Sequence, residues 1–238
     1  MKKGLLIVFC LFTSVLGWSQ SHSSKENSLN LSIAVGQTQG ALAASWQHDW
    51  QLGKKQKFVV GLGVRATGYV GRNQNYVTAP AKLTSGKTGL GVIFTENIAA
   101  NIDTFLVAKP NVFAINGLIN LGYRFNEKFT LGFNIDAIGF SFGGKRSGNY
   151  INGNQGRSES AKPTSFNVLL TSDNDRGTLN SEFYGQYVLN ERWRLHVGVQ
   201  FLFTEYTTYS KVQQRPESND RFRNKSLMFM IGAGFKLN

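Results

Sequence analysis

The chain has 238 residues and a formal net charge of +12 at pH 7, with a single cysteine and three histidines. One cysteine excludes an intramolecular disulfide framework. The basic residues are scattered between apolar stretches rather than gathered in one run, which is not the pattern of a nucleic-acid-binding protein. We therefore expect no nucleic-acid partner, and a chain of this length fits one main folded domain.

The N-terminal segment has the features of a secretory signal peptide. A pair of lysines precedes an apolar run from Leu5 to Leu16, and small residues follow at a spacing typical of a cleavage site. We expect residues 1–19 to be removed on export, residues 20–28 to form a linker, and residues 29–238 to form the folded domain. Cys10 lies in the expected signal, so the mature chain would carry no thiol.

Eight stretches of the chain alternate between large apolar residues and small or polar residues. In the third stretch the even positions from Phe58 are apolar, while the odd positions include Gly61, Gly63 and Arg65. A period of two predicts β-strands with two unlike faces, and we expect the apolar face to carry no Asp, Glu, Lys or Arg. The predicted strands are Leu29–Gly36, Ala41–Trp50, Lys57–Gly71, Val112–Phe125, Phe129–Phe142, Thr178–Leu189, Trp193–Tyr206 and Ser226–Leu237.

The connections between these strands are short on one side and mostly long on the other, as in outer-membrane barrels. The tight ones lie at 51–56, 126–128 and 190–192, and the long ones at 73–110, 143–177 and 207–225. After the expected signal, no run of about 18 apolar residues could form a transmembrane helix. Lipid leaves only a closed barrel to satisfy strand edges. We therefore predict an all-β fold, an eight-stranded antiparallel up-and-down transmembrane β-barrel in the cell outer membrane.

A soluble eight-stranded barrel of the lipocalin type is the main structural alternative, because it shares the strand count and the alternation. Its polar face would meet water, whereas the polar face here is built from small and amide residues such as Asn120, Gly122 and Asn134. Such residues suit a crowded interior. Aromatic residues gather where the apolar stripes meet the short turns, as in the interfacial belt of membrane barrels. They are Trp46, Trp50, Tyr123, Phe125, Phe129, Tyr187, Trp193 and Phe235.

These strands and turns resemble the small outer-membrane β-barrels of the OmpA/OmpX type, from about Leu29 to Asn238. The last strand, in which apolar residues alternate from Leu227 to Leu237, is similar to the C-terminal signal read by the outer-membrane assembly machinery. It ends in Leu237 and Asn238 rather than in an aromatic residue. The resemblance implies contact with outer-membrane lipid and lipopolysaccharide.

Three ionisable residues fall on the inward side at a similar depth, namely Arg65, Asp136 and Glu182. An unpaired buried charge is costly, so we predict that Arg65 contacts one or both carboxylates. The amides Asn116, Asn134 and Gln186 are expected to complete this network. We interpret it as a structural plug of ion pairs, and a gate or proton path is the alternative.

A second inward set lies near the short turns and forms either a solvated rim or a weak anion attractor. Its members are Arg124, Arg194, His196 and Lys236. No G-x-S-x-G or H-E-x-x-H motif is present. His48, between two tryptophans on the lipid-facing side, has no serine at the same-face spacing. We therefore predict no catalytic residues, no cofactor, no metal site and no enzyme activity.

The long loops hold the basic residues that we predict as surface anion contacts, because Lys and Arg form charge-assisted hydrogen bonds with phosphates of surface glycolipid. They are Lys145, Arg146, Arg215, Arg221 and Arg223. A role in solubility is the open alternative. Loop 73–110 is apolar, with helix-like spacing from Ile98 to Leu106, which predicts a short helix or a hairpin above the membrane. A further hairpin that makes ten barrel strands is also open.

The sequence thus favours a non-enzymatic outer-membrane protein whose barrel is an anchor and whose loops bind a surface partner or glycolipid. Eight strands enclose an interior that side chains just fill. Two alternatives stay open. One is a subunit of an outer-membrane secretion or assembly machine, which contacts another outer-membrane protein through the apolar loop. The other is a narrow porin-like channel.

Overall fold

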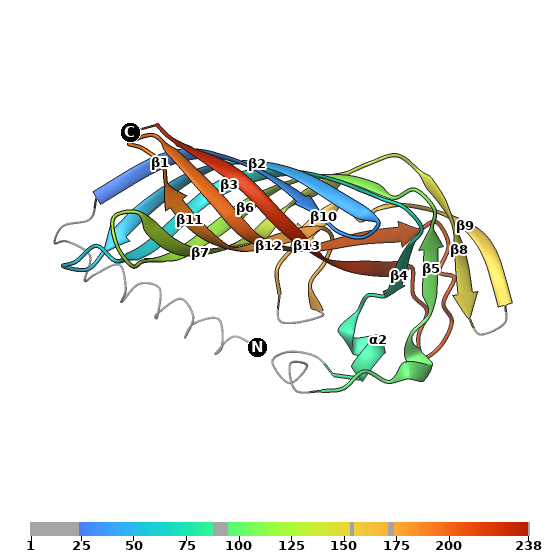
Figure 1. Cartoon of the computed structure of the whole chain (residues 1–238). Coiled ribbons are helices and arrows are strands. Elements are labelled where there is room, and N and C mark those ends of the chain that lie inside the picture. Colours follow the sequence, from blue (N-terminus) through green and yellow to red (C-terminus); the bar gives the residue numbers. More distant parts are fainter. Residues whose placement is uncertain (1–23, 88–94, 153–154, 171–173, 238) are drawn as a thin grey trace.

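The computed structural model describes residues 24–87, 95–152, 155–170 and 174–237, and the expected signal peptide lies outside them. The described chain forms one antiparallel sheet of thirteen strands that closes in a ring, with two short helices beside it (Figure 1). The strands are β1 (Ser24–Val35), β2 (Gln39–Leu52), β3 (Phe58–Gly71), β4 (Gln74–Thr78), β5 (Thr104–Val107), β6 (Asn111–Arg124), β7 (Phe129–Phe142), β8 (Arg146–Asn152), β9 (Gln155–Pro163), β10 (Phe166–Val168), β11 (Leu179–Val188), β12 (Trp193–Thr208) and β13 (Arg221–Lys236). The helices are α2 (Ala81–Ser85) and the 3-10 helix η2 (Ala99–Asn101).

Eight long strands, which match the eight predicted segments, pair in a closed cycle that we call the long-strand ring. Its order is β1, β2, β3, β6, β7, β11, β12, β13 and back to β1. Every pairing is antiparallel, and consecutive long strands are neighbours. β1 starts earlier than expected, because Ser24 already pairs with Gln51, so part of the predicted linker is strand.

A second ring continues from one end of the first, and it corrects the predicted strand number. The described chain contains thirteen strands rather than eight, because segments predicted as loops form β4, β5, β8, β9 and β10. The outer ends of β12 and β13 extend past the other long strands and pair with β9 and β4. Pairing of β4 with β5, β5 with β8 and β8 with β9 completes a six-stranded cycle, the second ring. It lies at the end of the molecule away from the tight turns (Figure 1).

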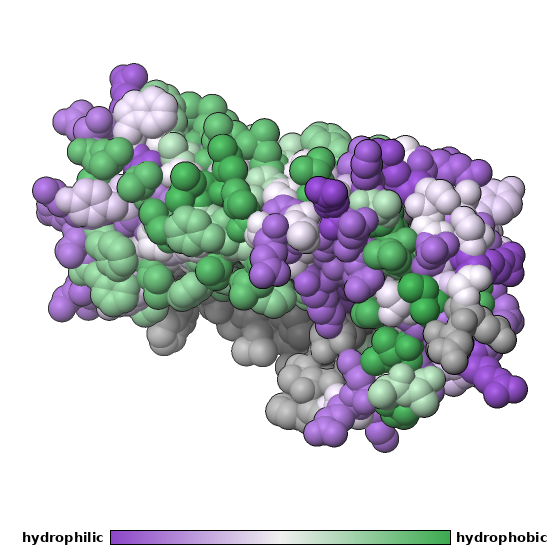
Figure 2. Space-filling view, turned by 45° about the vertical axis from the view of Figure 1, so that its right-hand side comes forward, coloured by the Kyte–Doolittle hydropathy of each residue, from purple (hydrophilic) through white to green (hydrophobic). Residues whose placement is uncertain are grey.

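The two faces of the long-strand ring have opposite chemistry, as predicted from the alternation. On β3, Leu62 is 54% exposed and Val64 is 50% exposed. Arg65, the residue after Val64, points to the other face and is 1% exposed. Outward apolar residues therefore cover the ring, while polar side chains fill it. Figure 2 shows the apolar surface gathered over the long strands and the hydrophilic surface over the second ring.

β7 departs from strict alternation, which corrects one detail of the prediction. Asn134 and Asp136 point inward, but Ile138, Phe140 and Phe142 at the same parity are exposed. A register shift explains the change. Gly117 of β6 pairs with Ile138, but Leu118, the next residue of β6, pairs with Asp136, so one residue of β7 is skipped. The extra residue on β7 is a β-bulge, which turns the bulky side chains back to the outside.

The segment 73–110 forms a hairpin outside the long-strand ring. Gln74 to Val77 of β4 pair with Thr104 to Val107 of β5, and α2 and η2 lie between them in the chain. The hairpin joins the second ring, so it does not make ten barrel strands. The helix predicted from the spacing of Ile98 to Leu106 is wrong, because Phe105 and Leu106 belong to β5 and only three preceding residues are helical. Residues 88–94 lie outside the described chain.

Candidate functional site

The interior of the long-strand ring holds a buried ion pair between β3 and β7. Arg65 Nη2 lies 2.6 Å from Asp136 Oδ1, and Arg65 Nε donates to the same oxygen at 2.9 Å. Both side chains are excluded from solvent. Arg65 also donates to the backbone carbonyl of Asn180 on β11. The guanidinium therefore ties three strands together across the ring.

Glu182 is the second carboxylate of this cluster. Its Oε2 lies 3.1 Å from Arg65 Nη1 and accepts a hydrogen bond from Asn134 Nδ2 at 2.9 Å. Its other oxygen accepts from Ser32 of β1 at 2.9 Å. Arg65 also donates to Asn134 Oδ1 at 2.5 Å. The one cation thus meets both predicted carboxylates.

Asn116 completes the cluster on the side towards the second ring. Its Nδ2 donates to Asp136 Oδ2 at 2.7 Å, and its Oδ1 accepts from Asn167 of β10 at 2.8 Å. The close approach requires a glycine on β7, because a Cβ at Gly139 would lie 2.2 Å from Asn116 Oδ1. The structure therefore brings together Arg65, Asp136, Glu182 and Asn116, and it adds Asn167, which the sequence reasoning did not single out.

The second inward set lies near the tight turns and also contains a carboxylate. Arg194 pairs with Glu26, and Lys236 Nζ lies 3.9 Å from the other oxygen of Glu26. His196 stacks on Tyr184, with ring centroids 4.9 Å apart. Gln186, expected in the Arg65 cluster, lines a small cavity of about 30 Å³ at this end instead.

His48 of β2 contacts an amide and an aromatic ring. His48 Nδ1 lies 2.8 Å from Asn27 Oδ1, and its ring makes an edge contact with Trp50 at 4.7 Å. Across the described ranges, no group of three or more His, Cys, Asp and Glu is arranged to hold a metal ion. None of the helices described is both long enough and apolar enough to cross a membrane.

Two of the five predicted surface anion contacts pair with one buried carboxylate, and the structure corrects the surface position of Arg223. Arg223 is 1% exposed, and its Nη2 lies 2.9 Å from Glu205 Oε2. Arg221 Nε lies 2.7 Å from the other oxygen of Glu205. Arg223 therefore neutralises a buried carboxylate instead of meeting an external anion, whereas Arg221 is 21% exposed and its contact with an external anion stays a prediction.

Glu205 itself corrects the expected absence of charge on the apolar face. It has the parity of Val197 to Phe203 on β12, but it lies past the apolar stripe, in the part of the strand that belongs to the second ring. There it pairs with Arg221 and Arg223, and both Glu205 and Arg223 are buried. The apolar stripe thus ends where the second ring begins.

The other three predicted contacts lie in the second ring and its connections. Arg146 Nε donates to Asn111 Oδ1 at 3.0 Å, which ties β8 to β6. Lys145 lies over the ring of Tyr209, 5.5 Å from its centroid. Lys145 and Arg215 border two different cavities.

The first of these, the basic cavity, has a volume of about 610 Å³. Lys145, Lys162 and Arg176 supply three cations to its wall, against one carboxylate from Asp220. Its further lining residues are mostly small or hydroxyl-bearing: Ser160, Ala161, Pro163, Thr164, Ser165, Thr207, Thr208 and Tyr209. The arrangement can hold an anion.

The basic cavity borders the apolar surface of the long-strand ring. Ser165 in its wall directly precedes Phe166 of β10, which pairs with Phe140 of β7. The two phenyl rings lie 5.8 Å apart, and both side chains are exposed. Cationic and apolar surfaces therefore meet at this rim.

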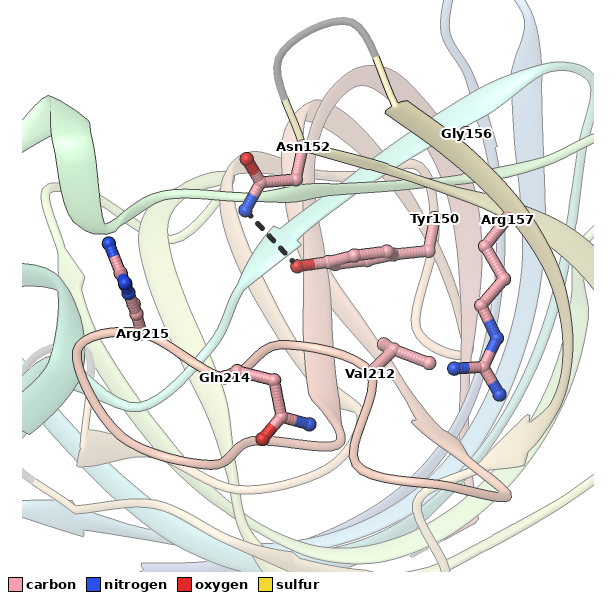
Figure 3. A pocket seen from close by; sticks show the side chains of 7 residues that line it. All are labelled: Tyr150, Asn152, Gly156, Arg157, Val212, Gln214 and Arg215. Atoms are coloured by element: carbon pink, nitrogen blue, oxygen red, sulfur yellow. Dashed lines mark hydrogen bonds between the residues drawn. The ribbon is translucent and has the colours of Figure 1, made fainter.

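The second, the mouth cavity, opens at the far end of the second ring and has a volume of about 780 Å³. Figure 3 shows Tyr150 of β8 at its centre, with Arg157 and Arg215 on opposite sides of that ring. The lining residues are Tyr150, Asn152, Gly156, Arg157, Val212, Gln214 and Arg215.

The aromatic interior of the second ring was missed by the sequence reasoning. Tyr76 and Tyr206 meet edge to face at 5.1 Å, and Phe222 contacts Phe105 at 5.7 Å and Tyr150 at 6.0 Å. All five side chains are buried. Aromatic residues recurring in the segments predicted as long loops were the available signal.

No known family model matches the chain, and no curated protein matches it. Solved structures with some likeness include Neisserial surface protein A, NspA, at 8% identity, 91% coverage of this chain, 100% coverage of that chain and a TM-score of 0.37. Ail, the attachment invasion locus protein of Yersinia pestis, in complex with the heparin analogue sucrose octasulfate, has 10% identity, coverages of 90% and 97%, and a TM-score of 0.32. The Ralstonia pickettii toluene transporter TbuX has 9% identity, coverages of 90% and 90%, and a TM-score of 0.25. Likeness of this extent transfers no function to this chain.

Proposed function

We propose that this chain is a non-enzymatic outer-membrane β-barrel, in which the long-strand ring is a membrane anchor and the second ring presents binding surfaces outside the cell. The observation that carries this proposal is the contrast on β3, where Leu62 and Val64 point outward and Arg65 is buried inside. A soluble protein places its charges outside and its leucines inside. This ring has the reverse arrangement.

The dimensions of the long strands support a membrane span. They contain 10 to 16 residues, whereas a tilted strand crosses a bilayer with about 9–11. A single lysine or arginine on the lipid face at mid-membrane costs about 2–4 kcal/mol. Outward positions such as Val197, Phe229 and Ile231 are apolar and exposed, so the ring is suited to lipid.

The packed interior supports an anchor rather than a channel. The contacts of Arg65 with Asp136 and Glu182 span the interior of the ring. Gln200 of β12 and Met228 of β13 are also buried there. An eight-stranded barrel has an interior that side chains just fill. We therefore expect no steady ionic current through the folded protein in a planar bilayer, and open-channel conductance would reject this part of the proposal.

The basic cavity supports glycolipid as a partner of the outer rim. Lys145, Lys162 and Arg176 stand beside exposed Phe140 and Phe166, so a ligand with phosphates above acyl chains would meet matching surfaces. Arginine and lysine bind phosphate oxygens through charge-assisted hydrogen bonds.

The test is the amount of phosphorylated outer-membrane glycolipid that purified protein retains in mild detergent. Replacing Lys145, Lys162 and Arg176 by glutamine should lower retention several-fold. The matched control replaces Lys54, Lys55 and Arg192 by glutamine, since these exposed cations lie at the tight-turn end. Equal losses in both variants would reduce the effect to net charge, and no loss in the first would exclude the basic cavity as the contact.

A further inference from the structure

The mouth cavity has features of a ligand site that are independent of the membrane anchor. Its volume of about 780 Å³ falls in the range of small-molecule pockets, about 300–1,000 Å³. Such pockets occur in the mouths of β-barrels. An inorganic anion would leave most of this space unfilled, so the cavity suits a larger ligand.

One wall of the cavity is held rigid by Tyr150. Its hydroxyl donates to Asp103 Oδ2 at 2.5 Å, and its ring packs against Phe222 with centroids 6.0 Å apart. Burial and this hydrogen bond raise the pKa of Tyr150 to about 12, so the phenol stays neutral at physiological pH. Asn152 Nδ2 also lies 3.4 Å from the hydroxyl.

The opposite wall is the segment from Val212 to Arg215, which one buried glutamine fixes. Gln213 Oε1 accepts from Thr78 at 3.0 Å and from Asn219 at 2.9 Å. Its Nε2 donates to the backbone carbonyls of Asn101 and Arg215, both at 2.9 Å. These four bonds use the whole hydrogen-bonding capacity of the side chain. The wall that carries Gln214 and Arg215 is therefore formed before any ligand binds.

The exposed groups of the cavity are mainly polar and cationic. Asn152 and Gln214 offer amide donors and acceptors, while Arg157 and Arg215 supply guanidinium groups from opposite sides (Figure 3). Arg157 lies 3.5 Å from Glu159 but remains 65% exposed, so it can also reach a ligand. Among the described residues, Arg215 has no ion-pair partner within 4.0 Å.

We propose that the mouth cavity binds an acidic saccharide, with Arg157 and Arg215 as contacts to its carboxylate groups and Asn152 and Gln214 as contacts to its hydroxyls. The planar guanidinium matches a carboxylate in a bidentate geometry. The polar lining disfavours an apolar ligand, and the fixed walls lower the ordering cost of binding. This site is separate from the basic cavity, which holds different residues.

The test is calorimetric titration of the full chain, folded in detergent micelles, with a short oligogalacturonate. Binding that weakens about tenfold in Arg157→Gln and in Arg215→Gln would support the site, as expected for loss of a charge-assisted hydrogen bond. Arg192→Gln, at the opposite end of the molecule, is the matched control and should bind like the original protein. Heat-modifiable migration in electrophoresis checks that each variant is folded.

Three further probes decide the ligand class. A malto-oligosaccharide of the same length should bind at least tenfold more weakly, because it lacks the carboxylates. Equal binding of that uncharged sugar would overturn the role of the arginines. Binding of a hexaglutamate peptide in place of oligogalacturonate would assign the cavity to acidic peptides and overturn the saccharide. Absence of binding by every probe, in protein that still inserts in lipid vesicles, would remove this site and leave the anchor proposal standing.

Discussion

The two rings of this molecule use one continuous sheet but place apolar and polar residues in opposite ways. Around the long strands the exposed residues are apolar, and the buried ones include Arg65 and Asp136. In the second ring the buried residues include large aromatic side chains such as Tyr76 and Phe105, and Figure 2 shows a mostly hydrophilic surface there. β12 and β13 run through both rings, and the character of their faces changes near Glu205. The two rings have the same backbone structure, so the difference in their side-chain patterns reflects the surroundings that each ring is suited to.

The largest expected effect lies inside the long-strand ring. Asp136→Ala leaves Arg65 buried with only part of its charge compensation, so the free energy of unfolding should fall by about 3–5 kcal/mol. Urea unfolding in lipid vesicles, followed by tryptophan fluorescence, measures it. The triple variant Arg65→Met, Asp136→Ala, Glu182→Gln should recover a large part of the loss, because it leaves no unpaired charge in the cluster. If Asp136→Ala were as stable as the original protein, the ion pair would have no part in holding the ring.

The outward face should respond almost as strongly to charge. Val197 is 43% exposed on β12, and Val197→Arg should destabilise the vesicle-inserted protein by about 2–4 kcal/mol. Ser158→Arg, at an exposed position of the second ring, is the matched control and should change stability little. Similar tolerance at both positions would mean that both rings face water.

A smaller and local effect is expected in the second ring. Thr204 Oγ1 donates to the Tyr76 hydroxyl at 3.1 Å, and both residues are buried. Tyr76→Phe removes this acceptor, which should cost about 1 kcal/mol. Hydrogen exchange should quicken in β4 and β5 while the amides of β2 and β3 keep their protection. Equal quickening in all four strands would show that the rings unfold as one unit.

The smallest effect is expected at the surface of the second ring. Lys82 and Glu217 form an ion pair at 2.8 Å, but their side chains are 60% and 57% exposed. Exposed pairs contribute about 0–1 kcal/mol. Lys82→Gln should therefore leave the unfolding midpoint almost unchanged. A loss of unfolding free energy as large as that of Asp136→Ala would contradict the expected difference between buried and exposed ion pairs.

Much of the long-strand ring could be predicted from the sequence alone, because apolar and polar residues alternate along strands of 10 to 16 residues. The phase that places Arg65 inside and Leu62 outside is read directly from alternation. Asp136 and Glu182 share the depth of Arg65, so their meeting could be predicted by counting from the tight turns. The bulge in β7 is also visible in the sequence, because the apolar positions change from odd numbers, as at Ile135, to even numbers, as at Ile138.

The second ring could not be derived in the same way. β4 and β5 have five and four residues, too few to establish a period. β4 also pairs with β13, where Thr78 lies opposite Phe222, 144 residues later in the chain, and local sequence holds no record of such a partner. The same limit explains why Arg223 was expected at the surface, because its burial depends on Glu205 and on a neighbouring connection.

The claim on which the account depends is that the apolar outer face of the long-strand ring lies in lipid. A spin label at Ile231→Cys, in protein inserted in lipid vesicles, tests it most directly through collisions with oxygen and with a water-soluble nickel complex. Ile231 is 51% exposed, and Ser158→Cys gives the comparison site in the second ring. We expect oxygen to relax the label at position 231 far more than nickel does, with the reverse at position 158. Strong nickel accessibility at position 231 would contradict the account.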